Sequence, residues 1–311
     1  MAKYLKAALF TAAYAFIYLF FMLLCQIVLG LTIGGAGKGL TEVLFNQQLA
    51  GGAPADIAAA NGEQITEAAN AASLLINGFV ESNTGLIFSI SALLSLLAYI
   101  QIFNIRKKDI FSVIRMKTRP SRTDVRFGAF AGASANFFIS AAVMLLQSLN
   151  LFKEAFSEHE THMENTFGSG GLLLTMLGIG IITPVVEEII FRGMVMYELG
   201  RAFPPVAVII VQGAVFGLFH LVPVQIFYTI PLGIYFGYIA YKSGSVWPAA
   251  AGHIAMNAVS ILLSSEGMAG IVETSQFSII FMLFSIYMFV SALIYFIKKK
   301  PADISPPDRF T

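Results

Sequence analysis

Eight long apolar stretches restrict what this 311-residue chain can fold into. A transmembrane helix needs about 20 consecutive apolar residues. The chain is 57% hydrophobic and 12% charged, whereas a soluble domain carries about 25% charged residues. We therefore expect an all-α, polytopic membrane protein with about eight transmembrane helices. The predicted spans are residues 7–31, 86–104, 127–149, 171–196, 206–222, 224–241, 246–264 and 277–297.

Basic residues alternate along the chain in the way that the positive-inside rule describes. If the N-terminus is cytoplasmic, sixteen of the 19 Lys and Arg residues fall on the cytoplasmic side. Lys38 and Lys153 fall outside, and Arg192 lies within a span. This asymmetry predicts an even number of spans with both termini in the cytoplasm. It also accounts for the basic run 106–126, which lacks the aromatic interleaving of a nucleic-acid site, so no nucleic-acid partner is expected.

The chain divides into three predicted regions. Residues 1–170 hold three spans and a long outer loop, 32–85, in which 56–75 could form an amphipathic helix. Residues 171–264 hold four spans and the polar residues discussed below, and 265–311 hold the last span and a cytoplasmic tail.

Two further loops are predicted. The inner loop 106–124 is expected to be irregular. The outer loop 151–170 places His159 and His162 among four glutamates. We interpret it as a solvated acidic loop because its ligand spacing is not that of a metal site.

Two adjacent carboxylates, Glu187 and Glu188, lie inside the fourth apolar stretch. A charge in hydrocarbon costs roughly 2.5–3.5 kcal/mol on insertion scales, so such a pair indicates a functional site. Glu188 and Arg192 are i and i+4 on one helix face and can pair. Glu187 points about 100° away and gains no partner from its own helix. A purely structural role in holding helices together is the alternative.

Two histidines and an asparagine lie in the following spans. His220 ends the run Phe216-Gly-Leu-Phe-His220, and His253 shares a helix face with Asn257 at i, i+4. Glu187 and His220 stand at similar distances from the turn near Phe203, so they are expected at equal depth. His253 is expected nearer the cytoplasm, and the sequence alone does not bring it level.

These residue types fit hydrolysis by activated water. A Glu and a His that share a water can act as general base and then general acid. A His or Asn can donate to a developing oxyanion. No Gly-x-Ser-x-Gly elbow occurs, and the single cysteine, Cys25, is remote in sequence. Two His and a Glu could instead bind zinc, although the His-Glu-x-x-His pattern is absent.

Three motifs resemble those of one family. Glu187-Glu188-x-x-x-Arg192, Phe216-x-x-x-His220 and His253-x-x-x-Asn257 match, in order, the motifs of the CAAX protease and bacteriocin-processing family of intramembrane glutamate proteases, also called Abi. Gly233-x-x-x-Gly237 and the following Ser243-Gly-Ser-Val-Trp247 are also typical of it. The resemblance covers residues 171–264.

The resemblance implies a helical membrane endopeptidase without an essential metal or other cofactor. By position, Glu187 and His220 would activate water. His253 and Asn257 would stabilise the oxyanion, and Glu188 and Arg192, with Phe216, would support the site. The substrate would be a membrane-associated peptide or protein, and the expected location is a bacterial plasma membrane.

Two other function classes stay open on sequence alone. A proton-coupled transporter would use Glu187 and the histidines as a proton relay. It is disfavoured because no internal repeat relates the two halves of the chain. A non-catalytic bacteriocin-immunity or scaffold protein would keep the fold without the chemistry.

Reporter fusions test the predicted topology. Fusions at Met1, Thr118 and Thr311 should report from the cytoplasm, and fusions at Gly52 and Thr161 from the outside, because of the charge asymmetry. A cytoplasmic signal from Gly52 would overturn the topology.

Overall fold

The computed structural model describes residues 1–50, 83–115, 119–149, 152–167, 171–264 and 275–301, which form helices and no strands. The prediction of an all-α fold is confirmed for these residues. The helices are α1 (Ala2–Ala50), α3 (Thr84–Ile105), α4 (Ile110–Val113), α5 (Arg122–Ser148), α6 (Lys153–Phe167), α7 (Leu172–Thr175), η1 (Met176–Ile182), α8 (Thr183–Glu188), η2 (Ile189–Val195), α9 (Met196–Gly200), α10 (Pro205–Leu218), α11 (Pro223–Ser243), α12 (Trp247–Leu263) and α14 (Ser275–Lys298).

Four helical segments are long and apolar enough to cross a membrane, counted over the described residues: Ala2–Val28, Thr84–Ile105, Leu172–Gly200 and Pro223–Ser243. Shorter apolar helices cover Pro205–Leu218, Trp247–Leu263 and Leu283–Lys298. The chain is an integral membrane protein. Each of the eight predicted spans overlaps helical residues, while the number of crossings stays a prediction.

Three loop predictions need correction. The predicted outer loop 32–85 is wrong at its start, because α1 continues as one helix to Ala50; the suggested amphipathic helix 56–75 lies outside the described residues. Residues 151–170 were expected to form a loop, but Lys153–Phe167 is the helix α6, in which His159 is buried. The inner loop contains the short helix α4, capped by the Asp109 carboxylate, which accepts from the Phe111 amide.

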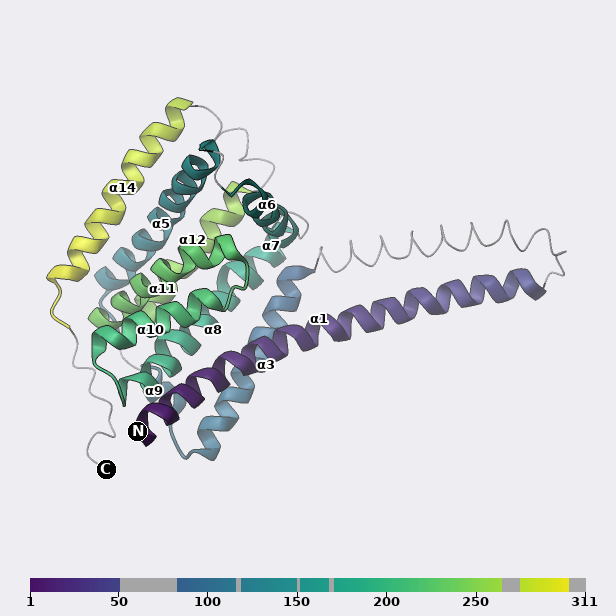
Figure 1. Cartoon of the computed structure of the whole chain (residues 1–311), viewed down its shortest axis with the longest axis horizontal. Coiled ribbons are helices and arrows are strands. Elements are labelled where there is room, and N and C mark those ends of the chain that lie inside the picture. The colour runs from purple at the N-terminus through teal and green to yellow at the C-terminus, as the bar shows by residue number, and fades with distance from the viewer. Residues whose placement is uncertain (51–82, 116–118, 150–151, 168–170, 265–274, 302–311) are drawn as a thin grey trace.

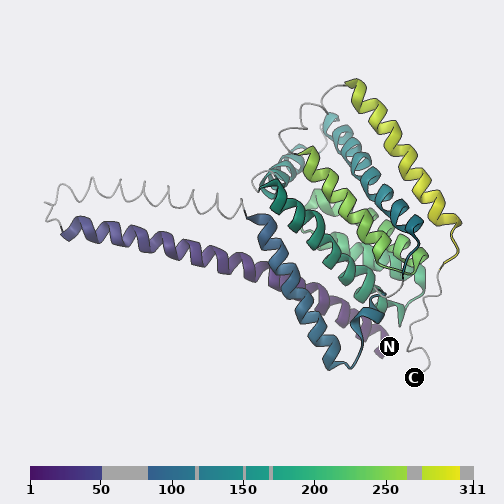
Figure 2. The same cartoon turned by 180° about the vertical axis from the view of Figure 1, so that it is seen from behind.

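The helices form one bundle, from which the C-terminal part of α1 extends away (Figures 1 and 2). α5 packs between α12 and α14 along one side, while α1 packs along α3 on the other. The segments α7 to α9 and the hairpin of α10 and α11 lie between these two groups of helices. α10 and α11 both begin at a proline, where a missing N–H costs no helical hydrogen bond. α11 ends at Gly244, which adopts the left-handed conformation (φ 68°) that closes the helix.

Ion pairs join helices at the end of the bundle that holds most basic residues. Arg106, just after α3, contacts Glu198 of α9 at 2.6 Å and the Tyr14 hydroxyl of α1 at 2.5 Å. Asp124 at the start of α5 contacts Lys299 at 3.0 Å and accepts from the Tyr295 hydroxyl of α14. Elements that are distant in sequence are therefore fixed to one another at this end.

The helical run Leu172–Gly200 is not a regular α-helix. It alternates α-helical turns with two π-helical segments, η1 and η2, on either side of α8. Pro184 lies in the first turn of α8 and cannot donate a backbone hydrogen bond. π-helical turns are common at functional sites because they change which side chains face one direction. Both glutamates, Glu187 and Glu188, lie in the α-helical piece between them.

Glycines let α5 approach α12 closely. A Cβ on Gly132 would overlap the Gly252 carbonyl, and one on Gly128 would overlap the Pro248 carbonyl. Both obstacles are backbone atoms, which cannot rotate away. This close approach fixes the position of α12, the helix that carries His253.

Substitution of Gly132 by Ala should lower thermal stability, because overpacking typically costs about 1–3 kcal/mol. The matched control is Gly200→Ala in α9, where a Cβ would meet nothing within 4 Å. Thermal melting of both variants in one detergent checks this. Equal stability of Gly132→Ala and wild type would contradict the close packing of α5 on α12.

Candidate active site

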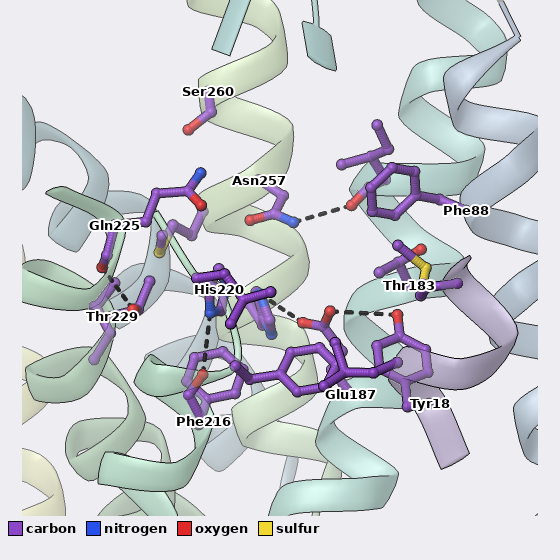
Figure 3. A pocket seen from close by; sticks show the side chains of 18 of the residues that line it. Tyr18, Phe88, Thr183, Glu187, Phe216, His220, Gln225, Thr229, Asn257 and Ser260 are labelled. Carbon is purple, nitrogen blue, oxygen red and sulfur yellow. Dashed lines mark hydrogen bonds and ion pairs between the residues drawn. The ribbon is translucent and has the colours of Figure 1, made fainter. Parts of the chain in front are cut away.

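A cavity of about 500 Å³ lies in the bundle and brings the predicted site residues together. Glu187, His220, His253 and Asn257 all line it, and so does Phe216. They come from α8, α10, α12 and the turn after α10. Figure 3 shows Glu187 and Tyr18 at one end of the cavity and Ser260 at the other, with His220 and Asn257 between them. Three sequence motifs thus meet at one cavity.

A buried ion cluster stands behind the cavity. Arg192 Nη1 donates to Glu188 Oε1 at 2.8 Å, as the i, i+4 spacing predicts, and both side chains are 0% exposed. The same carboxylate oxygen accepts from Nδ1 of His253 at 2.9 Å. The guanidinium also lies 4.3 Å over the Phe216 ring. Glu188 therefore interacts with Arg192 and His253, and its side chain does not line the cavity.

Glu187 has a different environment from its neighbour. Its side chain is 11% exposed, against 0% for Glu188. Oε1 of Glu187 accepts from the Tyr18 hydroxyl at 3.4 Å, and Oε2 lies 3.8 Å from Nε2 of His253. The adjacent carboxylates are thus separated by helix geometry into one that faces the cavity and one that is neutralised inside the protein.

The hydrogen-bond acceptors of the two histidines decide which ring nitrogen carries the hydrogen. Nδ1 of His220 lies 3.0 Å from the Phe216 carbonyl, which can only accept, so Nδ1 carries the hydrogen. Nδ1 of His253 likewise donates to Glu188. The Phe216 ring contacts both imidazoles edge-on, with centroids 5.0 Å from His220 and 5.7 Å from His253. When neutral, each histidine carries its lone pair on Nε2.

Asn257 is held by the irregular helix across the cavity. Its side-chain amide donates to the Ile179 carbonyl of η1 at 3.0 Å (Figure 3). Asn136 of α5 donates to the Ser260 hydroxyl one turn further along α12. These contacts fix the face of α12 that carries His253 and Asn257.

The structure adds residues that sequence reasoning missed. Tyr18 comes from α1, far from the motifs, and its only signal was a phenolic hydroxyl that needs a partner in an apolar span. Gln212 is fully buried and donates to the Gly233 carbonyl at 2.7 Å, and Arg192 Nη2 donates to the same carbonyl at 3.3 Å. Gly233 therefore does more than allow close helix packing.

No group of three or more His, Cys, Asp or Glu side chains suited to a metal ion occurs within the part of the chain that the structure describes. The predicted lack of a metal requirement stays a prediction that chelation can test. What the cavity offers is a carboxylate, two imidazoles and an amide in a largely apolar setting. These are the groups needed to deprotonate a water and to stabilise a developing anion.

Comparison with known families identifies the stretch that carries these groups. Residues 169–259 match the family model described as Rce1-like, type II CAAX prenyl endopeptidase Rce1-like. This stretch, called the Rce1-like domain below, is similar to that family. The match is consistent with the predicted CAAX protease and bacteriocin-processing family, and it includes all seven motif residues from Glu187 to Asn257. Neither the curated proteins nor the solved structures include a significant match. At family level, the Rce1-like domain supports a CAAX-type intramembrane protease.

Replacing Glu188 by Gln tests the ion cluster. Gln can still accept from His253, but it leaves Arg192 as an unpaired buried charge, which typically destabilises by roughly 3–5 kcal/mol. We expect lower thermal stability and yield. The double variant Glu188→Gln, Arg192→Met should recover part of the loss, since no lone charge remains.

Melting of the three proteins in one detergent measures this. A Glu188→Gln protein with wild-type stability would show that the pair does not need mutual neutralisation.

Proposed function

We propose that the protein is an intramembrane endopeptidase in which Glu187 activates water for attack on a peptide bond. One observation supports this above all others: of two adjacent carboxylates, only Glu187 faces the cavity, whereas Glu188 is neutralised by Arg192 and His253. A general base must reach its water, and a carboxylate in an ion pair is a poorer base.

The proposed chemistry begins with the water proton. Glu187 takes this proton while Nε2 of His220, the unprotonated nitrogen, accepts the second water hydrogen bond. The hydroxide oxygen bonds to the peptide carbonyl carbon, and the carbonyl oxygen becomes an oxyanion. The C–N bond then breaks, and the proton held by Glu187 passes to the leaving amine. One water is consumed, and one carboxyl and one amine are formed.

In this scheme, His253 and Asn257 stabilise the oxyanion. Asn257 can donate from its amide, which is oriented by Ile179. Nε2 of His253 can donate only when the ring is protonated, because Nδ1–H already contacts Glu188. The Glu188 carboxylate accepts from Nδ1–H and thereby fixes the orientation of the His253 ring. Glu188 therefore has a second proposed role besides pairing with Arg192.

Tyr18 is proposed as a positioning residue for the base. Its hydroxyl donates to Oε1 of Glu187, which leaves Oε2 on the side of His253. Tyr18 and Phe219 also stack, with ring centroids 5.1 Å apart, so the phenol is held by packing. Through this contact, α1 contributes to a site whose other groups come from the Rce1-like domain.

Glu187→Gln should reduce single-turnover cleavage by about 10²–10⁴-fold while melting stays close to wild type, because Gln keeps the shape but cannot take the proton. The matched control is Glu154→Gln, the same change at an exposed position of α6. Membrane peptides that accumulate in cells carrying Glu187→Gln, identified by mass spectrometry, provide the substrate for the assay.

Two outcomes would count against the proposal. Full activity of a folded Glu187→Gln protein would remove it from the role of base. Activity that is lost to a chelator and restored by zinc would favour the zinc alternative.

A further inference from the structure

The cavity extends from Glu187 toward one end of the bundle only. In the helices that line it, the lining residues leave out the end that lies farther from α6. In α1 they run from Tyr18 to Gln26, and in α12 from His253 to Ser260. In α11, which runs in the opposite direction, they run from Gln225 to Phe236. The cavity thus extends from Glu187 toward Ser260 (Figure 3), which is the direction of the end of the bundle where α6 lies.

The opposite direction from Glu187 is closed by packed side chains. Ile190, Phe191 and Met194 of η2 are each 0% exposed. Ile114, directly after α4, is 1% exposed and would meet a Cβ placed on Gly193. Beyond this layer lies the ion pair of Arg106 and Glu198. Over the described residues, no cavity residue comes from this side.

The closed end is the basic end of the bundle. Helix ends and connections there carry Lys3, Lys6, Arg106, Lys107, Lys108, Arg115, Arg119, Arg122, Arg126, Arg201, Lys242, Lys298, Lys299 and Lys300. At the α6 end, the described side chains include one cationic residue, Lys153. Connections rich in Lys and Arg stay in the cytoplasm, so the charge distribution assigns the closed end to that side.

We infer that the substrate segment reaches Glu187 from the non-cytoplasmic side. The substrate class is then a peptide, or a membrane protein segment, that is exposed outside the cytoplasm or in the outer leaflet. The inference on substrate rests on the proposed function, whereas the inference on access rests on cavity shape and charge alone.

The cavity walls favour an apolar segment. Leu23 of α1 lines the cavity and is also 57% exposed, so its side chain contacts both the cavity and the outside of the bundle. Met163 of α6 lies at the other wall, where its sulfur contacts Gln225 Nε2 at 3.5 Å. α6 therefore forms part of the cavity wall on the side from which the substrate would come.

Cysteine accessibility tests the direction of access without requiring proteolysis. In a Cys25→Ser background, single cysteines replace Ser260 or Gln225 in the cavity, Thr161 on the exposed face of α6, and Thr123 at the basic end. Intact cells are treated with a small, charged methanethiosulfonate that does not cross membranes. We expect both cavity cysteines and Thr161→Cys to react at least tenfold faster than Thr123→Cys, and Thr123→Cys to react fully after permeabilisation.

Each other pattern contradicts the inference. Reaction of Thr123→Cys but not Thr161→Cys in intact cells would show the reverse orientation. Reaction of Thr161→Cys, with both cavity cysteines reactive only after permeabilisation, would show access from the cytoplasm. Cavity cysteines that stay unreactive in both conditions would show a closed cavity. If labelling is as expected but no peptide is cleaved in a Glu187-dependent way, the proposed function fails and the direction of access stands.

Discussion

The buried contact between Arg192, Glu188 and His253 is the interaction on which the rest of the site depends. Charges inside a membrane protein are costly unless they are paired and hydrogen-bonded. Glu188 meets this condition by accepting from both partners through one oxygen. Arg192 adds the Gly233 carbonyl of α11 and the Phe216 ring of α10. Five elements, α8, η2, α10, α11 and α12, are thereby held together around one buried ion pair.

Once this cluster is formed, the position of Glu187 follows. A residue adjacent to Glu188 on a helix points about 100° away, and here that direction leads into the cavity. The π-helical turns on either side of α8 adjust the helix without breaking it. The close approach of α5 through Gly132 and Gly252 holds α12 in place. The proposed base, its histidine and the oxyanion donor are therefore positioned by packing that extends well beyond the motifs.

The same architecture separates the two ends of the bundle. At one end, η2, α4 and the ion pair of Arg106 with Glu198 form a closed layer. At the other, α6 and the turn between α10 and α11 surround an open space. A water-dependent reaction needs a path for water as well as for substrate, and this fold offers such a path in one direction. Most of the basic side chains that the structure describes gather at the end that is closed.

The sequence by itself determined those features that depend on local periodicity: the apolar spans, the charge asymmetry, and the pairing of Glu188 with Arg192 on one helix face. It also selected six of the seven motif residues, since polar groups in apolar spans are conspicuous, while Phe216 came from the resemblance to a known family. It did not predict that His253 reaches Glu188, that Tyr18 contacts Glu187, that α1 extends to Ala50, or that Lys153–Phe167 is a helix. The sequence left open the depth of His253 in the membrane, because a depth calculated from helix rise alone assumes straight helices and level turns. Tilt, register and π-helical turns arise from how side chains and glycines pack between helices, so only the tertiary structure decided which groups meet.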